Sequence, residues 1–240
     1  MITEIDAERL VIVSDLHLGN PASEAAGPFR DFLDFVQDER RTLVINGDGF
    51  EMLQTRFSRV VREALPLMSR ITRMRKAGLP VYYVVGNHDI YMEHFLDDWM
   101  VTGICPFLNV TSGGKRIRIE HGHLYDIVFS RAPEFYEAAT RFLGLFILAK
   151  PDVYKLWDFA SRRIDGRREN SSADQRDSHH RAASEVLRRG FDVVVHGHTH
   201  RAEMTQMERG LYVNSGAWLH GGTYVEVDSG RIELKDWGRA

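Results

Sequence analysis

Six short runs with strand character, each followed directly by a polar motif, constrain the fold of this chain more than any other feature. The runs are Leu10–Val13, Leu43–Ile45, Val81–Val85, Arg116–Glu120, Val193–Val195 and Leu211–Val213. Five of them are continuous, apolar and mostly β-branched, which is typical of strands buried on both faces. Arg116–Glu120 alternates polar and apolar residues, which predicts a half-exposed strand.

Segments with helical periodicity separate several of these runs. Apolar residues recur at steps of three and four in Pro28–Asp38, which predicts a helix with one buried face. A second helix is predicted over Ser58–Ala77, and Ser184–Arg189 predicts the end of a third; a glycine follows each. The alternation of strands and helices predicts an α/β fold. Three late strands near residues 211–214, 223–227 and 231–235 are joined by short turns and predict a meander.

Length and composition exclude several classes of protein. The 240 residues suffice for a single domain over 1–240, and the formal net charge of -3 gives no basic field for nucleic acid, so we expect no nucleic-acid partner. The opening residues MITEIDAERL do not resemble a signal peptide, and no apolar run reaches the roughly 18 residues of a membrane span. Cys105 is the single cysteine, which excludes an intrachain disulfide and favours a reducing, cytoplasmic setting.

A segment from about 131 to 168 has no strand pattern and is rich in large apolar residues. It predicts a helical cap inserted between two strands, which Pro151 divides into two helices. One interpretation is an apolar lid that shelters acyl chains or contacts a membrane, with its arginines near a diphosphate or anionic headgroups. The other interpretation is a pair of amphipathic helices that pack on the domain or on a second subunit.

The polar motifs place His, Asp and Asn side chains beyond the carboxyl ends of strands, where open α/β sheets bind ligands. The candidate metal ligands among them are Asp15, His17, Asp48, Asn87, His121, His198 and His200. Each motif alone is weak evidence, because Gly and Asn also suit plain turns. Together they are strong evidence, because so many polar side chains at one sheet edge would be costly to bury without a ligand.

The donor set favours two metal ions over one. Oxygen and imidazole donors suit Mn²⁺, Fe²⁺ or Zn²⁺, and seven donors exceed what one tetrahedral ion needs. A carboxylate such as Asp48 can bridge two cations, and two ions about 3.5–4 Å apart form the usual clamp for phosphoryl transfer. His123 has the spacing to replace His121 as a ligand, but we favour His121 because it follows its strand first. His196 is expected to support the ligands, while His179 and His180 are expected at the surface.

The motifs SDLH, GD, GNHD, HGH and HGHTH occur in this order, and the ordered set resembles the calcineurin-like metallophosphoesterase superfamily. The resemblance implies a four-layer αββα sandwich of two mixed sheets, with the cap as an insertion. It also implies a first metal ion held by Asp15, His17, Asp48 and His200. A second ion would be held by Asp48, Asn87, His121 and His198.

The resemblance implies catalytic roles as well. His88 occupies the position of a catalytic histidine near the leaving-group oxygen, Glu51 would orient that histidine, and Asp89 would lie in the layer behind. Two divalent ions, expected to be Mn²⁺ with Fe²⁺, Zn²⁺ or Mg²⁺ as alternatives, would activate a shared water as hydroxide for in-line attack on phosphorus. His88 would neutralise charge on the phosphoryl oxygens and protonate the leaving group.

Within the superfamily, the sequence is most similar to the UDP-2,3-diacylglucosamine pyrophosphatases of lipid A synthesis. The similarity lies in Gly47–Glu51, in Gly216–Trp218 and in the position of the cap. It implies a phosphorylated small molecule or nucleotide–lipid as substrate, and a cytoplasmic location with peripheral contact to the inner membrane through the cap. The alternatives are a soluble nucleotide or general phosphodiesterase, and a non-catalytic interaction module on the same fold.

Overall fold

The computed structural model describes residues 3–91, 101–126, 169–219 and 221–238. The cap predicted over about 131–168 lies outside these residues. Among the helices that are described, none is both long and apolar enough to cross a bilayer.

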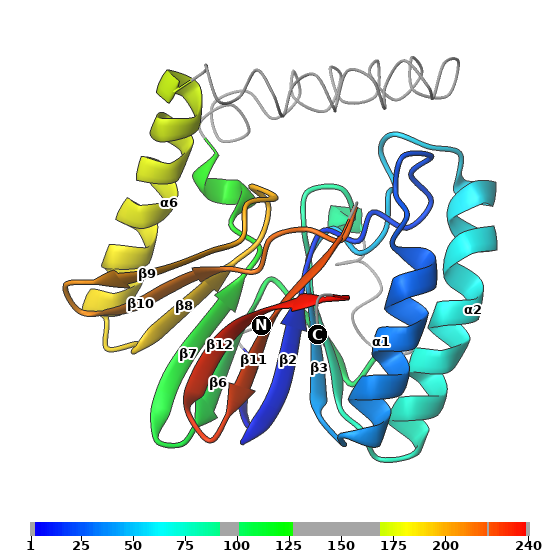
Figure 1. The fold of residues 1–240 in the computed structure, drawn as a ribbon, viewed down its shortest axis with the longest axis horizontal. Helices are drawn as coiled ribbons and strands as arrows, with labels where there is room; N and C mark the ends of the chain where they lie inside the picture. Colours follow the sequence, from blue (N-terminus) through cyan, green and yellow to red (C-terminus); the bar gives the residue numbers. More distant parts are fainter. Residues whose placement is uncertain (1–2, 92–100, 127–168, 220, 239–240) are drawn as a thin grey trace.

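Two six-stranded sheets, each with parallel and antiparallel pairs, form the centre of the fold (Figure 1). Sheet A has the strand order β1 (Thr3–Asp6), β6 (Phe107–Ser112), β7 (Lys115–Glu120), β8 (Val193–His196), β10 (Gly210–Asn214) and β9 (Glu203–Met207). Sheet B has the order β12 (Arg231–Trp237), β11 (Gly222–Asp228), β2 (Arg9–Val13), β3 (Thr42–Asn46), β4 (Val81–Val84) and β5 (Gly103–Cys105).

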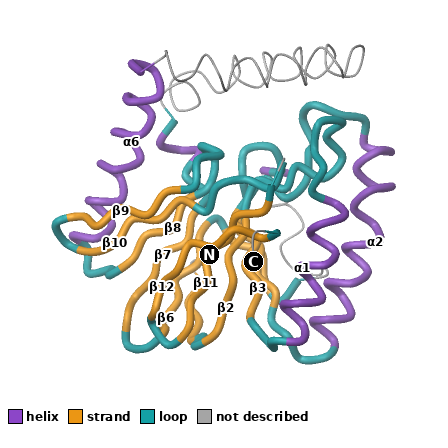
Figure 2. Tube along the Cα trace, viewed as in Figure 1, coloured by secondary structure: helices purple, strands orange, loops and turns teal. Residues whose placement is uncertain are grey.

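Helices cover the outer face of each sheet. Helices α1 (Ala26–Asp38) and α2 (Phe57–Lys76) pack on sheet B, and α6 (Glu169–Arg188) packs on sheet A (Figures 1 and 2). One apolar core lies between α1, α2 and sheet B, and a second lies between the two sheets. The predicted αββα sandwich of two mixed sheets is therefore confirmed.

Strand β2 shows why the predicted runs are continuously apolar. Its side chains alternate between the two cores: Leu10 and Ile12 point between the sheets, while Val11 and Val13 point toward the helices. All four side chains are fully buried. A strand with a core on each side needs apolar residues at every position, which is the pattern from which the sequence predicted it.

The predicted meander of the late strands is wrong. β10 pairs with β8 and β9 in sheet A, whereas β11 forms a hairpin with β12 in sheet B. The chain crosses between the sheets after β10, and Trp218 in that connection is buried against Phe29 and Phe32 of α1. A short connection can join strands of two different sheets as well as two strands of a hairpin. Loop length alone therefore did not show that β10 and β11 belong to different sheets.

We expect Phe32→Ala to lower the free energy of unfolding by about 3–5 kcal/mol, because the ring is fully buried and contacts Trp218, Tyr224 and Trp237. Phe57→Ala serves as the matched control, since this ring is 69% exposed and its loss should change stability by less than about 0.5 kcal/mol. Urea denaturation of both variants measures the difference. Equal effects would contradict the assignment of Phe32 to the core.

Candidate metal centre

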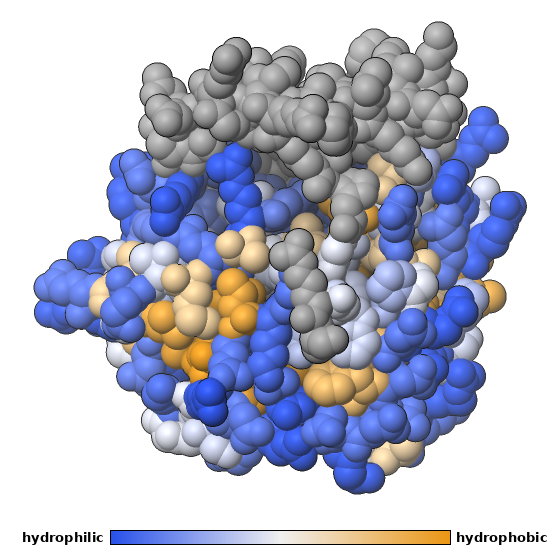
Figure 3. Space-filling view, in the orientation of Figure 1, coloured by the Kyte–Doolittle hydropathy of each residue, from blue (hydrophilic) through white to orange (hydrophobic). Residues whose placement is uncertain are grey.

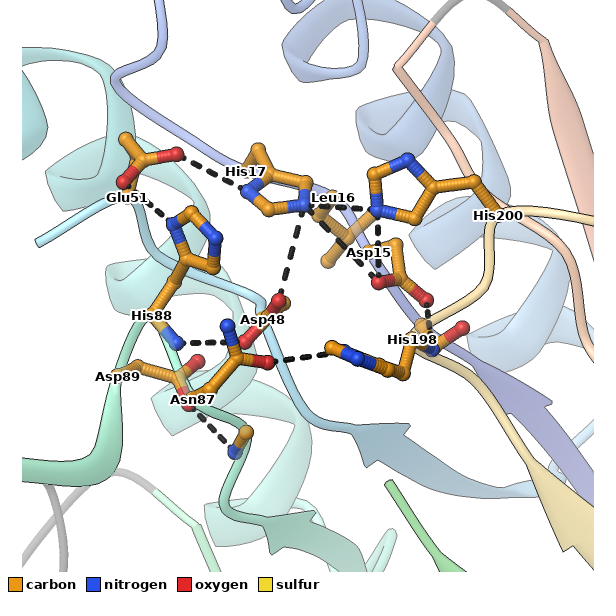
Figure 4. Close-up of polar contacts among 12 residues, drawn as sticks. Asp15, Leu16, His17, Asp48, Glu51, Asn87, His88, Asp89, His198 and His200 are labelled. Carbon is orange, nitrogen blue, oxygen red and sulfur yellow. Dashed lines mark hydrogen bonds and ion pairs between the residues drawn. The ribbon is translucent and has the colours of Figure 1, made fainter. Parts of the chain in front are cut away.

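The polar motifs of both sheets meet at one edge of the sandwich. The parallel strands β2, β3 and β4 end there in sheet B, and the parallel strands β7 and β8 end there in sheet A. Backbone hydrogen bonds join the loops directly: Asp15 N to Gly47 O (3.1 Å), His17 N to Asp48 O (2.9 Å), and Gly197 N to His121 O (3.0 Å). Figure 4 shows side chains from these loops converging on one point.

Asp15, His17 and His200 form the first group of donor atoms. His200 Nε2 lies 3.1 Å from Asp15 Oδ1 and 3.3 Å from His17 Nε2. His17 Nε2 is also 3.8 Å from Asp48 Oδ2, which connects this group to the next. One ligand atom from each of the three residues lies within 4.8 Å of the others, close enough to share one ion.

Asp48, His121 and His198 form a second group with the same spacing, within 4.8 Å. His121 Nε2 lies 3.3 Å from Asp48 Oδ2, and Asn87 Oδ1 lies 3.0 Å from His198 Nδ1. Asp48 therefore stands between the two groups, in the place that a bridging carboxylate requires. All seven candidate ligands predicted from the sequence come together here.

The donors fit divalent cations on electrostatic grounds. Burial raises the pKa of Asp15 and Asp48, but the neighbouring histidines outweigh it, so the pKa of each carboxyl is lowered and both are ionised. Asp15 Oδ1 and His121 Nε2 are buried and face other candidate ligands, His200 Nε2 at 3.1 Å and Asp48 Oδ2 at 3.3 Å. A metal ion held between such buried donor atoms would satisfy them.

Backbone strain is concentrated in the same residues. Among the described residues, seven other than glycine have positive φ, and five of these are candidate ligands: Asp15 (55°), His17 (45°), Asp48 (52°), His198 (65°) and His200 (58°). This left-handed conformation is uncommon outside glycine, and strain of this kind costs on the order of 1–3 kcal/mol per residue. Its concentration in the ligand loops indicates that the loops are shaped for function.

Hydrogen bonds fix which ring nitrogen each histidine presents. His17 donates from Nδ1 to Glu51 Oε2 (3.1 Å), and His121 donates from Nδ1 to the carbonyl of Asn46 (2.8 Å). Nε2 of each ring is thereby directed at the donor groups. Gly47, with φ of 79°, is required because a Cβ there would collide with the His121 ring. His198 is turned the other way and donates from Nε2 to Asp126 Oδ2 (3.2 Å), which leaves Nδ1 facing Asn87.

Glu51 joins a candidate ligand to the predicted catalytic histidine. Its Oε1 accepts a bond from His88 Nδ1 (2.7 Å), while Oε2 accepts from His17 and from Asn20 Nδ2 (3.2 Å). Burial lowers the pKa of His88, but the charges of Glu51 and Asp48 outweigh it and raise that pKa to about 9. In the metal-free protein His88 is therefore an imidazolium ion at neutral pH. Its position supports the role predicted for Glu51.

Asp89 bonds to the loops that carry the ligands. Its carboxylate accepts from Gly86 N (2.7 Å) and Gly49 N (2.9 Å) and forms a short hydrogen bond with the Tyr83 hydroxyl. Burial and the charge of Asp48 raise the pKa of Asp89 to about 6. These contacts match the supporting position predicted from the sequence.

His121 and His123 differ sharply in their surroundings. His121 belongs to the second donor group, while His123 begins the 3₁₀ helix His123–Tyr125. Burial and the nearby His121 lower the pKa of His123 to about 3. The geometry therefore favours His121 as the ligand.

A buried polar network behind the second group was missed in part by the sequence analysis. His196 lies 3.1 Å from His179 between their Nδ1 atoms and 3.3 Å from Glu120 Oε1, which also accepts from the Tyr125 hydroxyl (3.0 Å). The expectation that His179 is at the surface is wrong, since it is 1% exposed. A signal was present: on α6 the buried residues His179, Ala183 and Leu187 recur at steps of four.

We expect Glu51→Gln to lower the pKa of His88 in the metal-free protein, because the substitution removes the negative charge beside the ring. The histidine signals of the two proteins, followed by NMR over a pH titration, measure the change. The raised pKa also predicts a stability effect: the His88–Glu51 pair stabilises the metal-free fold fully below pH about 6.5 and loses that contribution as pH rises toward about 9. A His88 pKa unchanged by Glu51→Gln would contradict this coupling.

We expect Mn²⁺ affinity to increase as pH rises toward about 10. The charge of Asp48 outweighs burial and raises the pKa of His121 to about 10, so metal binding must displace a proton from this ring. Asp48→Asn should weaken Mn²⁺ binding by at least about 100-fold, whereas the exposed control Asp38→Asn should not change it. Isothermal titration in buffers of different ionisation enthalpy measures both affinity and proton release. Binding without proton release would contradict the assignment of His121.

Comparison with known proteins agrees with this geometry. A sequence profile for the family described as calcineurin-like phosphoesterase matches residues 8–202. A protein named UDP-2,3-diacylglucosamine hydrolase from Bordetella parapertussis is 28% identical over 204 residues, covering 80% of this chain and 77% of that protein. One of the same name from Stenotrophomonas maltophilia is 26% identical over 253 aligned residues, covering 95% and 98%.

The fold is also found among solved structures. An archaeal phosphodiesterase matches 95% of this chain and 99% of its own with a TM-score of 0.50, at 15% identity, which supports the architecture alone. The family profile, in contrast, covers most of the sequence and includes every candidate ligand from Asp15 to His200. This chain therefore belongs to the calcineurin-like phosphoesterase family.

Proposed function

We propose that this protein is a hydrolase that uses two divalent metal ions to cleave a phosphodiester or pyrophosphate bond. The observation that carries the proposal is the pair of adjacent donor groups, which Asp48 Oδ2 connects at 3.8 Å from His17 Nε2, with His88 beside them. In this assignment one ion is held by Asp15, His17, Asp48 and His200. The other is held by Asp48, Asn87, His121 and His198.

The chemistry divides between the ions and the side chains. When bound, the ions would lower the pKa of water to supply a nucleophile near neutral pH and would offset charge on the phosphoryl group. Glu51 holds His88 by Nδ1, so the opposite edge of the ring is left to stabilise a phosphoryl oxygen and, when protonated, to donate a proton to the leaving oxygen. Asp89 and Asp126 keep the ligand loops and the His198 ring in position.

For the substrate, we propose a nucleoside diphosphate linked to a lipid, of the UDP-2,3-diacylglucosamine kind, cleaved at its pyrophosphate bond. The support comes from relatives of that name, which align over 93–95% of this chain in several species at 24–26% identity. A soluble nucleotide or general phosphodiester is the alternative. The two differ in whether turnover requires the lipid part of the molecule.

Activity measurements test the proposal. After chelation and addition of one metal at a time, the protein is assayed on UDP-2,3-diacylglucosamine in detergent micelles and on bis(p-nitrophenyl) phosphate. Asp48→Asn should abolish turnover of both substrates, and His88→Asn should lower kcat by about 10²–10⁴-fold. Asp38→Asn is the control with the same charge change at an exposed position.

The outcomes separate the candidate functions. Preferred turnover of the lipid nucleotide supports the proposed substrate, and turnover of the small diester alone supports the soluble alternative. Metal binding without hydrolysis of either compound would favour a non-catalytic role. Full activity of Asp48→Asn would contradict the assignment of this metal centre as the active site.

A further inference from the structure

An exposed apolar stripe runs along the N-terminal half of α2. Phe57, Val61 and Leu65 are 69%, 39% and 55% exposed, and they recur at steps of four, so they lie on one side of the helix. The buried residues of α2, including Val60, Ala64 and Leu67, occupy a different side that faces the core. The stripe is therefore apolar surface outside the core that α2 forms with sheet B.

A basic hollow lies next to this stripe. It has a volume of about 450 Å³ and is lined by Thr55, Arg56, Ser58, Arg59, Arg62 and Glu63. Arg59 pairs with Glu63 at 2.9 Å, while no described residue forms an ion pair with Arg56 or Arg62. The hollow therefore carries two positive charges that form no ion pair with a described residue, beside the hydroxyl groups of Thr55 and Ser58. Thr55 Oγ1 is buried and has no hydrogen-bond partner among the described residues.

The same part of α2 is tied to the metal centre. Glu63 Oε2 accepts a hydrogen bond from Gly19 N (3.0 Å), only two residues after the candidate ligand His17. Gly19 packs so closely on α2 that a Cβ there would lie 2.8 Å from Val60 Cα. In Figures 1 and 2, α2 begins at the end of the molecule where the ligand loops gather. A surface bound by this half of α2 would therefore lie at the end of the molecule that carries the metal centre.

We propose that the N-terminal half of α2 is a docking surface for an anionic phospholipid bilayer. The hollow receives lipid phosphate between Arg56 and Arg62, and Phe57, Val61 and Leu65 enter the boundary between headgroups and acyl chains. Charge complementarity supports this occupant: basic side chains beside an exposed apolar stripe are the features by which helices bind in a membrane interface. Figure 3 shows hydrophilic side chains projecting along the side of the molecule that α2 forms.

A bilayer accounts for both features of this surface, whereas nucleic acid accounts for one. Phosphates of either partner could pair with Arg56 and Arg62, but a nucleic acid backbone offers no apolar phase for Val61 and Leu65. The docking surface requires no turnover and does not rest on the proposed substrate. It would hold the protein at a membrane even if the hydrolysed compound were soluble.

Vesicle sedimentation with the full chain tests the proposal. The wild-type protein should sediment with vesicles of phosphatidylcholine and phosphatidylglycerol and stay in solution with phosphatidylcholine alone. Each arginine near an anionic surface contributes about fivefold in affinity, so the double variant Arg56→Ser, Arg62→Ser should bind about 25-fold more weakly. The double variant Phe57→Ser, Leu65→Ser should lose at least about tenfold.

The control is Arg209→Ser, an exposed arginine in the turn between β9 and β10, on the opposite side of the molecule from α2 (Figure 1). It should bind as the wild type does. Hydrolysis of bis(p-nitrophenyl) phosphate and the melting temperature should be equal in all four proteins, because none of these side chains belongs to the metal centre or the core. Weaker vesicle binding would then result from the altered docking surface and not from unfolding.

Several results would overturn the proposal. Wild-type protein that stays in solution with both kinds of vesicle has no such surface on α2. Equal binding of the Arg56→Ser, Arg62→Ser variant places any membrane contact elsewhere on the chain. Binding of a single-stranded oligonucleotide by the wild type, without vesicle binding, assigns the basic hollow to nucleic acid instead.

Discussion

Burial of strands on both faces is the constraint on which this structure depends. A strand such as β2 or β3 is stable only if one core covers each of its faces, and the αββα arrangement supplies those two cores. The stacked sheets bring the carboxyl ends of β2, β3 and β4 to the same edge as those of β7 and β8. Hydrogen bonds join the loops of Asp15 and Asp48 within sheet B, and the bond from His121 to the Asn46 carbonyl links them to sheet A.

The centre is built from layers of support that lie behind the donor atoms. Glu51 fixes two imidazole rings at once, Asp126 fixes a third, and Asp89 fixes loop backbone. Each supporting carboxylate accepts a hydrogen bond from a ring or backbone nitrogen that does not face the metal site. His17, His121 and His198 therefore each have one ring nitrogen held by a hydrogen bond and the other directed at the donor groups.

The sequence contained most of this site but only part of the fold. Strand ends followed by Asp, Asn or His were visible as local patterns, and the seven candidate ligands named from them lie close together in the structure. Strands β1, β5, β6 and β9 were missed. β5 has only three residues, and β1 and β9 are partly exposed edge strands with many polar residues. The sheet that receives β10 could not be predicted, because the pattern of a strand reports how it is buried but does not identify its partner. Asp126 lies close to the HGH motif in the sequence, but its partner His198 is 72 positions away, so their contact could not be predicted.

The left-handed backbone of the ligand loops limits how this centre can be redesigned. Asp, Asn and His are the residues other than glycine that adopt this conformation most readily, and they are also good donors for divalent ions. At Asp15, Asp48 and His200 the conformational and the chemical requirements therefore select the same few amino acids. Introducing Cys or Glu at these positions to change metal preference would strain the backbone, whatever the new side chain offered as a ligand. New specificity is more accessible through Asn87 or His121, which are absent from the strained set.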